Sequence, residues 1–292
     1  MVIVAFVAGA CGGSDNATPD APSTACKDMG GSACFQLPTA PLSNRDGAPS
    51  VLGCGAFVPT PAPAPITFSG TFLAYGTSKP IAGGSIKVYD SVDFATPIAT
   101  AISATDGAYS VTYPAGTRNE LFGEFSAAGF LTIFPHYVRA DLSQGDVSMY
   151  TLRIATSDNI ESAGLLVKEI WDPTSAVVAG TALDCNSLIV MHAAIVVSSA
   201  SGTRQFVPGV SVYYGSPGAV PLAVPPGDRA DTNDNGAFAL FHVKPQQPLF
   251  VQMWGFVDGA AQAKGEAGLT LIGESPIHVV ADTSISLNLW AK

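Results

Sequence analysis

Residues 105–111 read Thr-Asp-Gly-Ala-Tyr-Ser-Val, and residues 232–240 read Thr-Asn-Asp-Asn-Gly-Ala-Phe-Ala-Leu. In both stretches a turn signal that ends in glycine precedes a run in which large apolar residues alternate with small or polar ones. Tight turns between strands need a positive φ, which Asn, Asp and Gly adopt at the least cost. The alternation is the period of a half-buried strand. The stretches therefore predict a turn followed by a β-strand, with a tight hairpin at Asp106-Gly107.

More runs of the same kind surround the first stretch. The predicted strands of this half are 70–75, 85–89, 99–104, 108–113, 121–125 and 147–154. Turn residues separate these six short runs, and no long helical pattern interrupts them. We therefore expect an antiparallel β-sandwich over residues 67–155.

The second half of the chain repeats this order. Residues 180–183 match 70–73, residues 255–256 match 129–130, and residues 282–289 correspond to 146–152. The offset between the copies changes along the chain, which predicts an insertion over residues 198–216 with an extra strand at 210–214. The sequence thus predicts a second sandwich over residues 178–292, so that the fold is mainly β.

A helical connector is predicted between the copies, over residues 156–177. Its apolar residues recur at three- and four-residue steps: Ile160, Ala163, Val167, Ile170 and Trp171. Asp158 can cap the helix with Glu161 in the capping-box position, and Asp172-Pro173 ends it.

The turn and strand motifs resemble the carboxypeptidase regulatory-like domain. The first copy has Gly83-Gly84 before the strand at 86–88, then the Asp-Gly-x-aromatic turn within 105–109, then Gly129-Phe130. The second copy fits through Val-Pro-Gly-Val at 207–210 and Asn-Gly-Ala-Phe at 235–238. The resemblance implies a transthyretin-like (prealbumin-type) β-sandwich in each copy. It also implies a non-catalytic accessory or surface module with no shared active site.

Residues 1–10 are apolar and end in small residues, and Cys11 follows directly with a polar segment after it. An apolar stretch of this length is typical of a secretory signal. Its end resembles a bacterial lipoprotein signal, which implies that Cys11 is acylated and that residues 1–11 form the signal segment. No Lys or Arg precedes Lys27, so we expect the natural start to lie upstream. Gly12 after the cysteine implies sorting to the outer membrane, on its periplasmic or surface face.

Residues 12–66 are small, polar and rich in proline, and residues 58–65 read Val-Pro-Thr-Pro-Ala-Pro-Ala-Pro. Alternating proline favours an extended, semi-rigid polyproline II spacer. We therefore expect a flexible stalk between the anchor and the first sandwich.

Four further cysteines remain, and in an exported chain their default state is disulfide-bonded. They are Cys26, Cys34, Cys54 and Cys185. Their spacing does not fit paired Cys-x-x-Cys zinc knuckles, and three connectivities are open. Because Cys185 is distant in sequence, it either ties the amino-terminal segment to the second copy or stays a thiol.

Charge and hydropathy exclude two classes of protein. The chain has 13 basic and 23 acidic residues and a net charge of −10, so a nucleic-acid partner is not expected. Its mean hydropathy is +0.32, yet no run reaches the roughly 20 apolar residues that span a bilayer. The expected contact with a membrane is the lipid on Cys11.

One stretch of the second copy resembles part of a metal site. Asp231, Asn233 and Asn235 match the first half of a calcium loop, but its twelfth position holds His242 and not the bidentate Glu. The simpler interpretation is a turn whose Asn and Asp side chains bond their own main chain. Weak calcium binding stays as an alternative, and no cofactor is expected.

Aromatic residues supply the candidate ligand-binding surface. Tyr213 and Tyr214 are adjacent in the predicted inserted strand, so their side chains point to opposite faces and one can be exposed. Trp254 stands where the first copy has Ala128. Exposed aromatic rings stack on sugars, although the simpler interpretation places Trp254 in the core.

Catalytic patterns are weak. There is no Gly-x-Ser-x-Gly elbow. His192, His242, Tyr213 and Tyr214 are the residue types that hold iron in intradiol dioxygenases, but that family's His-Arg-x-x-His stretch is missing. We therefore do not expect an enzyme.

The predicted function is a lipid-anchored, non-catalytic protein of the cell envelope with tandem sandwich modules in a binding or structural role, its partner an unknown envelope protein or polysaccharide. The alternative is a carbohydrate-binding adhesin module that acts through Tyr213, Tyr214 and Trp254. A hydrolase or metal-dependent enzyme on the same scaffold is the third interpretation.

Overall fold

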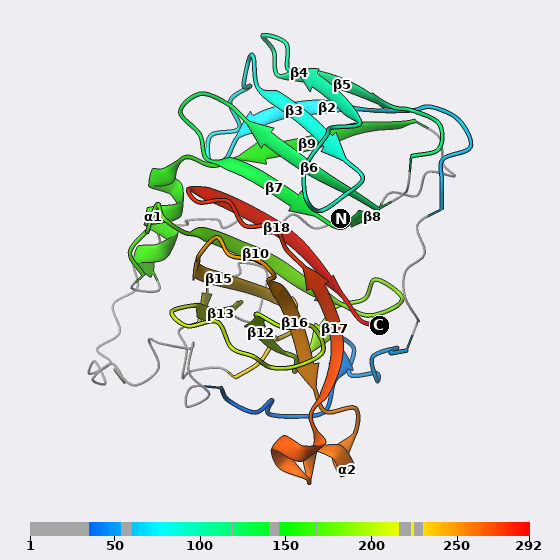
Figure 1. The fold of residues 1–292 in the computed structure, drawn as a ribbon, viewed down its shortest axis with the longest axis vertical. Helices are drawn as coiled ribbons and strands as arrows, with labels where there is room; N and C mark the ends of the chain where they lie inside the picture. Colours follow the sequence, from blue (N-terminus) through cyan, green and yellow to red (C-terminus); the bar gives the residue numbers. More distant parts are fainter. Residues whose placement is uncertain are drawn as a thin grey trace.

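A computed structural model describes residues 35–53, 60–117, 120–139, 146–166, 169–215, 223–224 and 230–292 (Figure 1). The fold is mainly β, with several sheets and little helix. Its strands form two β-sandwich units, one above the other in Figure 1. Among the described residues, no helix is both long enough and apolar enough to cross a membrane.

The first unit packs two sheets against each other. One sheet has the order β5-β2-β9, in which β2 runs antiparallel to β5 and parallel to β9. The facing strands have the order β7-β6-β3-β4, and β8 pairs with β6. The bounds are β2 Ile66–Ala74, β3 Ser85–Tyr89, β4 Ala99–Ile102, β5 Ala108–Tyr113, β6 Glu120–Ser126, β7 Thr132–His136, β8 Val138–Arg139 and β9 Val147–Ile154. Phe72, Ile86 and Ile154 lie in the core between the sheets.

The second unit repeats the first. The strand order β15-β10-β18 has the same pairing senses as β5-β2-β9, and β12-β16-β17 forms the facing sheet. The bounds are β10 Ala176–Leu183, β11 Val190–Met191, β12 Ala194–Ser198, β13 Ser211–Gly215, β14 Ala223–Val224, β15 Ala237–Val243, β16 Phe250–Gly255, β17 Thr270–Pro276 and β18 Thr283–Trp290. Helix α2 (Gly259–Gln262) and a 3-10 turn (Gly265–Gly268) connect β16 to β17.

The two turns that mark the repeat have equivalent geometry. Gly107 and Gly236 both have positive φ, and each accepts a main-chain hydrogen bond at its carbonyl: from Phe72 N at 2.7 Å and from Ala182 N at 2.9 Å. The hairpin predicted at Asp106-Gly107 is wrong. Strand β5 pairs with β2, and β4 pairs with β3, so this turn leads from one sheet to the other.

The predicted insertion strand also has a different role. Strand β13 follows β12 in the chain as β4 follows β3, but β13 pairs with β15, whereas β4 stays beside β3. Therefore β13 is the counterpart of β4 on the opposite sheet and not an extra strand.

The two units share one sheet. Strand β18 runs parallel to β7 from Thr283 beside Thr132 to Leu287 beside His136. This pairing produces a ten-stranded sheet with the order β14-β13-β15-β10-β18-β7-β6-β3-β4, to which β8 is added beside β6. One hydrophobic cluster includes Phe122 and Phe134 of the first unit and Ile277 and Leu287 of the second. The boundary between the units is therefore a packed core.

Helix α1 (Ser157–Leu166) connects the units, but its cap differs from the prediction. Thr156, not Asp158, is the cap: its Oγ1 accepts from Asn159 N at 3.3 Å, and Asn159 Oδ1 accepts from Thr156 N at 3.1 Å. Asn159 thus has the reciprocal role predicted for Glu161. Ile170, which we placed on the buried stripe, lies beyond the helix and is 79% exposed.

The predicted stalk is wrong where the structure describes it. Residues 35–53, which we call the strap, lie on the second unit, and β1 (Ser43–Asn44) within the strap pairs with β11. Nearer the first sandwich, Ala62 N donates to Thr117 O at 2.7 Å. Composition predicted an isolated spacer, but main-chain hydrogen bonds attach both segments to the folded units.

Candidate functional site

The three aromatic residues predicted to bind a ligand are all buried. Tyr214 points into the second sandwich, where its Oη accepts from Ile195 N at 2.9 Å. Tyr213 lies on the opposite face, in a cluster with Ile160 and Trp171. Trp254 donates through Nε1 to Gln252 Oε1 at 3.0 Å. The aromatic platform is therefore not exposed: the connector after β9 covers Tyr213 on the outer face of β13, and Trp254 is buried, as its simpler interpretation predicted.

A cluster of hydrogen bonds around one carboxylate, that of Glu169, lies on that covered face. Glu169 Oε1 accepts from Tyr213 Oη, and Glu169 Oε2 lies 2.8 Å from His242 Nε2. Burial would raise the pKa of Glu169, but hydrogen bonds from His242, Tyr213 and Ser211 outweigh burial and hold the pKa below its usual value. The bond to Glu169 raises the pKa of His242. The result is a hydrogen-bonded histidine–carboxylate pair that joins the chain after α1 to β13 and β15.

His242 occupies a strained position. Its φ is +61°, and the register between β10 and β15 shifts beside it, between Ala176 and Val178. Residues other than glycine that have a left-handed backbone conformation are often found at β-bulges and at functional sites. The charge of Asp172 also raises the pKa of this imidazole, and the charge of Lys244 lowers it.

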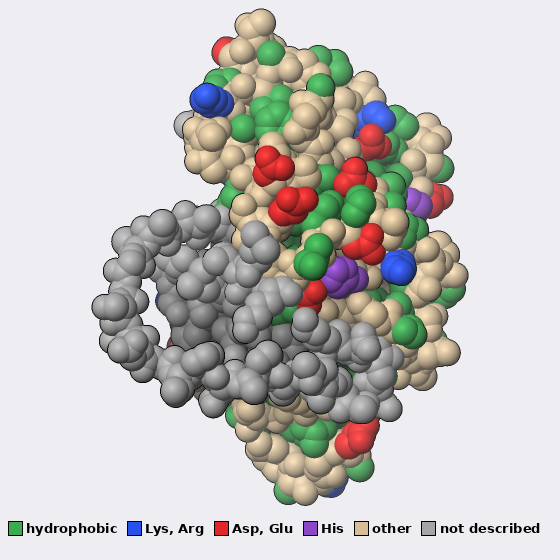
Figure 2. Space-filling model, turned by 90° about the vertical axis from the view of Figure 1, so that its left-hand side faces the viewer, with side chains coloured by type: hydrophobic (Ala, Val, Ile, Leu, Met, Phe, Trp, Pro, Cys, Tyr) green, Lys and Arg blue, Asp and Glu red, His purple; other side chains and the backbone are tan. Residues whose placement is uncertain are grey.

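In the view of Figure 2, the described surface is more acidic than basic, in keeping with the net charge of −10.

In the calcium candidate, the side-chain oxygens of the two asparagines and one oxygen of Asp231 accept hydrogen bonds from within the protein. Asn233 Oδ1 accepts from Asn235 N at 3.0 Å, and Asn235 Oδ1 accepts from Ala237 N at 2.9 Å, so both oxygens stabilise the turn. Asp231 Oδ2 accepts from Thr39 N and Thr39 Oγ1 at 2.6 and 2.7 Å. Within the described ranges, no group of three or more His, Cys, Asp or Glu side chains could hold a metal ion.

The four histidines lie in three separate places. His242 pairs with Glu169, and His192 Nδ1 lies 3.5 Å from Asp231 Oδ2. His136 and His278 meet at the boundary between the units, where His278 N donates to His136 Nε2 at 3.3 Å. Because Tyr213 and Tyr214 also point to opposite faces, the iron-binding set considered from sequence is not brought together.

The structure reveals a strap-binding groove that the sequence did not. Thr39 is clamped by Asp231, and Gln262 Nε2 donates to Thr39 O at 2.9 Å. Leu42 N donates to Phe256 O at 2.9 Å. No local motif marks residues 35–53 as a docking segment, because its hydrogen-bond partners in the second unit lie at least 133 residues later in the chain.

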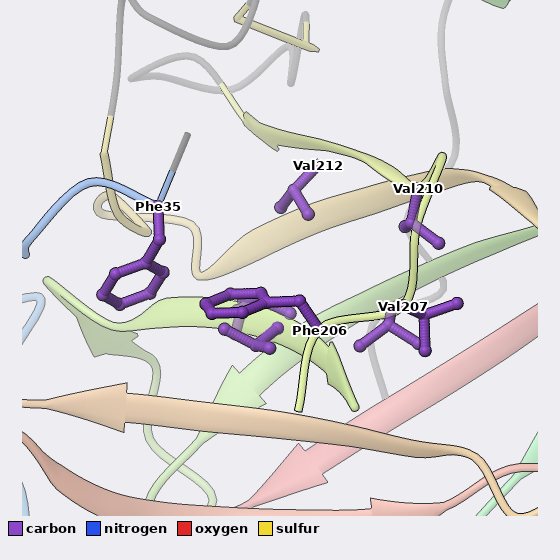
Figure 3. A pocket seen from close by; sticks show the side chains of 8 residues that line it. Phe35, Phe206, Val207, Val210 and Val212 are labelled. Carbon is purple, nitrogen blue, oxygen red and sulfur yellow. The ribbon is translucent and has the colours of Figure 1, made fainter. Parts of the chain in front are cut away.

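A small apolar pocket lies beside the amino-terminal part of the strap (Figure 3). Phe35 of the strap and Phe206 face each other there, with ring centroids 5.6 Å apart. The guanidinium of Arg204 lies 4.9 Å from the Phe35 ring and 5.1 Å from the Trp254 ring. The other lining residues are Ile195, Val196, Val197, Val207, Val210 and Val212.

The predicted lipidation site and three of the four remaining cysteines lie outside the described residues. These are Cys11, Cys26, Cys34 and Cys54. Cys185, in the turn between β10 and β11, is disulfide-bonded.

Comparison with known proteins gives low similarity. No family model matches the chain, and no curated protein matches it. The shaft pilin SpaA from Lactobacillus rhamnosus GG is similar at 12% identity and a TM-score of 0.22, over 80% of this chain and 98% of that chain. The minor pilin GBS52 of Streptococcus agalactiae is similar at 11% identity and a TM-score of 0.23, over 78% and 95%.

An enzyme is found at the same level. Chlorocatechol 1,2-dioxygenase from Pseudomonas putida is similar at 15% identity and a TM-score of 0.22, over 37% of this chain and 71% of that chain. Similarity of this degree does not assign a function.

Proposed function

We propose that the chain is a non-catalytic protein of the cell envelope in which two carboxypeptidase regulatory-like, transthyretin-like sandwiches have a structural or binding role. In this proposal the acylated Cys11 holds the protein in the outer membrane. The partner is an envelope protein or polysaccharide.

The shared sheet is the observation that carries the structural role. Domains within one chain usually move relative to each other unless a large hydrophobic interface joins them. Here the parallel pair of β7 and β18 continues one sheet through both units, and a single hydrophobic cluster includes residues of both. A molecule built in this way can hold the surfaces of its two units at a fixed separation.

The anchor is tested on the native amino terminus. We expect mass spectrometry of the membrane fraction to find a mature chain that starts at acylated Cys11, and precursor to accumulate when the lipoprotein signal peptidase is inhibited. Cys11→Ala is the matched variant and should release the chain from the membrane fraction. A soluble wild-type chain with an unmodified Cys11 would contradict the anchor.

The structural role is tested by the rigidity of the pair of units. Spin labels at exposed Thr112 of the first unit and Ala263 of the second should give one narrow distance distribution. A broad distribution would show that the units move independently, and the proposed role would then lose its support.

A further inference from the structure

The strap is recognised by the second unit as an extended peptide. Pro41 forms a parallel bridge with Phe256, and Ser43 and Asn44 pair antiparallel with Met191 and Val190. Main-chain pairing of this kind binds extended peptides in many complexes, while pockets for side chains supply the selectivity. The strap therefore has the character of a bound ligand that belongs to the same chain.

Two side chains give this recognition its selectivity. Leu42 is 5% exposed, and its side chain fills the space above Gly255, where an added Cβ would lie 2.5 Å from Leu42 Cδ2. Thr39 directs both its main-chain N–H and its hydroxyl to the carboxylate of Asp231, which is 1% exposed. Hydrogen bonds to a buried carboxylate are among the stronger ones. The groove thus selects a threonine three residues before a leucine.

The strap and its groove belong to different units. After the strap the chain enters the first unit at β2, whereas every strap contact described above is made with the second unit. The strap would make the same contacts if the groove belonged to another molecule. Whether the strap binds its own groove or that of a second copy therefore depends on the effective concentration of each groove and on the order of folding. We propose that the groove also accepts the strap of a second copy of this chain, which produces an arm-exchanged dimer.

The disulfide of Cys185 would link the two chains of an exchanged dimer covalently. All four possible partners lie at or before residue 54, and Cys185 N donates to Val51 O of the strap at 3.2 Å. In the monomer the bond is internal. In the exchanged dimer it joins two chains, so the dimer survives denaturation without a reducing agent and separates with one.

Complementation between two damaged full chains tests the proposal. Gly255→Val blocks the groove, because its side chain takes the place of Leu42, and Leu42→Asp disables the strap. We expect each variant alone to be monomeric after refolding in oxidised and reduced glutathione, and the mixture to form a disulfide-linked heterodimer. Gly259→Val is the matched control, because a Cβ there meets nothing within 4 Å; this variant keeps its own groove open, so its mixture with Leu42→Asp should give several-fold less heterodimer than the mixture of the two damaged chains. A mixture of the two damaged chains that stays monomeric, although both variants keep the wild-type circular dichroism, would overturn the proposal.

Wild-type protein provides a second test if either variant fails to fold. Two differently tagged wild-type chains are refolded together at high concentration, with and without a synthetic peptide of residues 35–53. We expect mixed-tag dimers on a non-reducing gel, and a several-fold decrease in them when the peptide is in excess. A peptide with Thr39→Val and Leu42→Asp should have no effect. Binding of the wild-type peptide without any mixed-tag dimer would mean that the groove accepts free peptides but not a second copy, which would overturn the proposal. Both tests use protein in solution, so failure of the Cys11 anchor would not affect them.

Discussion

At the scale of single residues, Gly107 and Gly236 carry the repeat. Each combines a positive φ with a close approach to another main chain: a Cβ on Gly107 would lie 2.6 Å from Phe72 O, and one on Gly236 would lie 3.0 Å from Ala182 O. Glycine is the residue that meets both demands. The turn chemistry that was visible in the sequence therefore reflects sheet-to-sheet packing as well as backbone conformation.

Alanine substitutions can separate the effect of the positive φ from the effect of the close approach to another main chain. Gly107→Ala should destabilise the protein by more than the roughly 1–2 kcal/mol of the left-handed conformation alone, because Phe72 O must also move. Gly116→Ala is the control, since Gly116 also has a positive φ (+83°) but open space around it. Urea denaturation measures both. Equal losses would contradict the importance of the close approach.

His136 makes stability depend on pH. Burial lowers its pKa from 6.5 to about 4; the hydrogen bond to Phe134 O opposes this shift, and the charge of His278 adds to it. Between these values the unfolded chain binds the proton and the folded chain does not, so stability falls as the pH falls below 6.5. The loss at pH 5 should be about 2 kcal/mol relative to neutral pH. Denaturation of His136→Gln should show a smaller pH slope than the wild type; an unchanged slope would assign the effect to another group.

At the scale of elements, runs of apolar residues between turn signals located most strands of the first unit. Residues 85–89, 108–113 and 147–154 were expected as strands and are β3, β5 and β9. Strand β7 escaped notice because Pro135 interrupts its pattern, and proline is rare in interior strands; here Pro135 lies beside Ser286 of β18.

The candidate sites were harder to predict than the strands. A single strand pattern shows that Tyr213 and Tyr214 point to opposite faces, but not that the connector after β9 covers one of those faces. Glu169 and His242 meet because the chain after α1 folds back over β15, which no local signal contains. The docked position of the strap could not be predicted for the same reason. It depends on contacts with Asp231 and Phe256, which the composition of the strap itself does not reveal.

The cap of α1 can be tested by a matched pair of substitutions. Thr156→Ala removes a capping hydroxyl and should cost about 1 kcal/mol. Ser162→Ala removes an exposed hydroxyl that bonds Asp158 O within the helix and should be near neutral. Chemical denaturation followed by circular dichroism measures both. A larger effect of the Ser162 change than of the Thr156 change would contradict the assignment of Thr156 as the cap.

The strap contributes to stability through one buried side chain. Leu42→Ala should destabilise the protein by about 2–5 kcal/mol, as for other leucines in well-packed sites. Leu37→Ala changes a strap residue that is 39% exposed and should stay within about 0.5 kcal/mol. Thermal melts of both variants with the disulfide intact make the comparison. Similar melting temperatures would mean that the strap packs loosely.

At the scale of the whole molecule, the shared sheet should make unfolding a single event. All three tryptophans, Trp171, Trp254 and Trp290, lie in the second half of the chain, whereas Phe72 lies in the core of the first unit. Phe72→Ala should therefore lower the melting temperature seen by tryptophan fluorescence as much as that seen by circular dichroism. A fluorescence transition that does not move would show that the units unfold separately.

The place of β18 in the shared sheet has a consequence for how the protein is made. Of the described strands this one comes last in sequence, yet it lies at the centre of the sheet, between β10 and β7. Until the ribosome has released residues 283–290, both neighbours have an open edge, and the two halves have nothing to join them. A nascent chain that stalls before residue 283 would expose both of these unpaired strand edges at once. Assembly of the two units into one molecule therefore has to wait for the synthesis of residues 283–290.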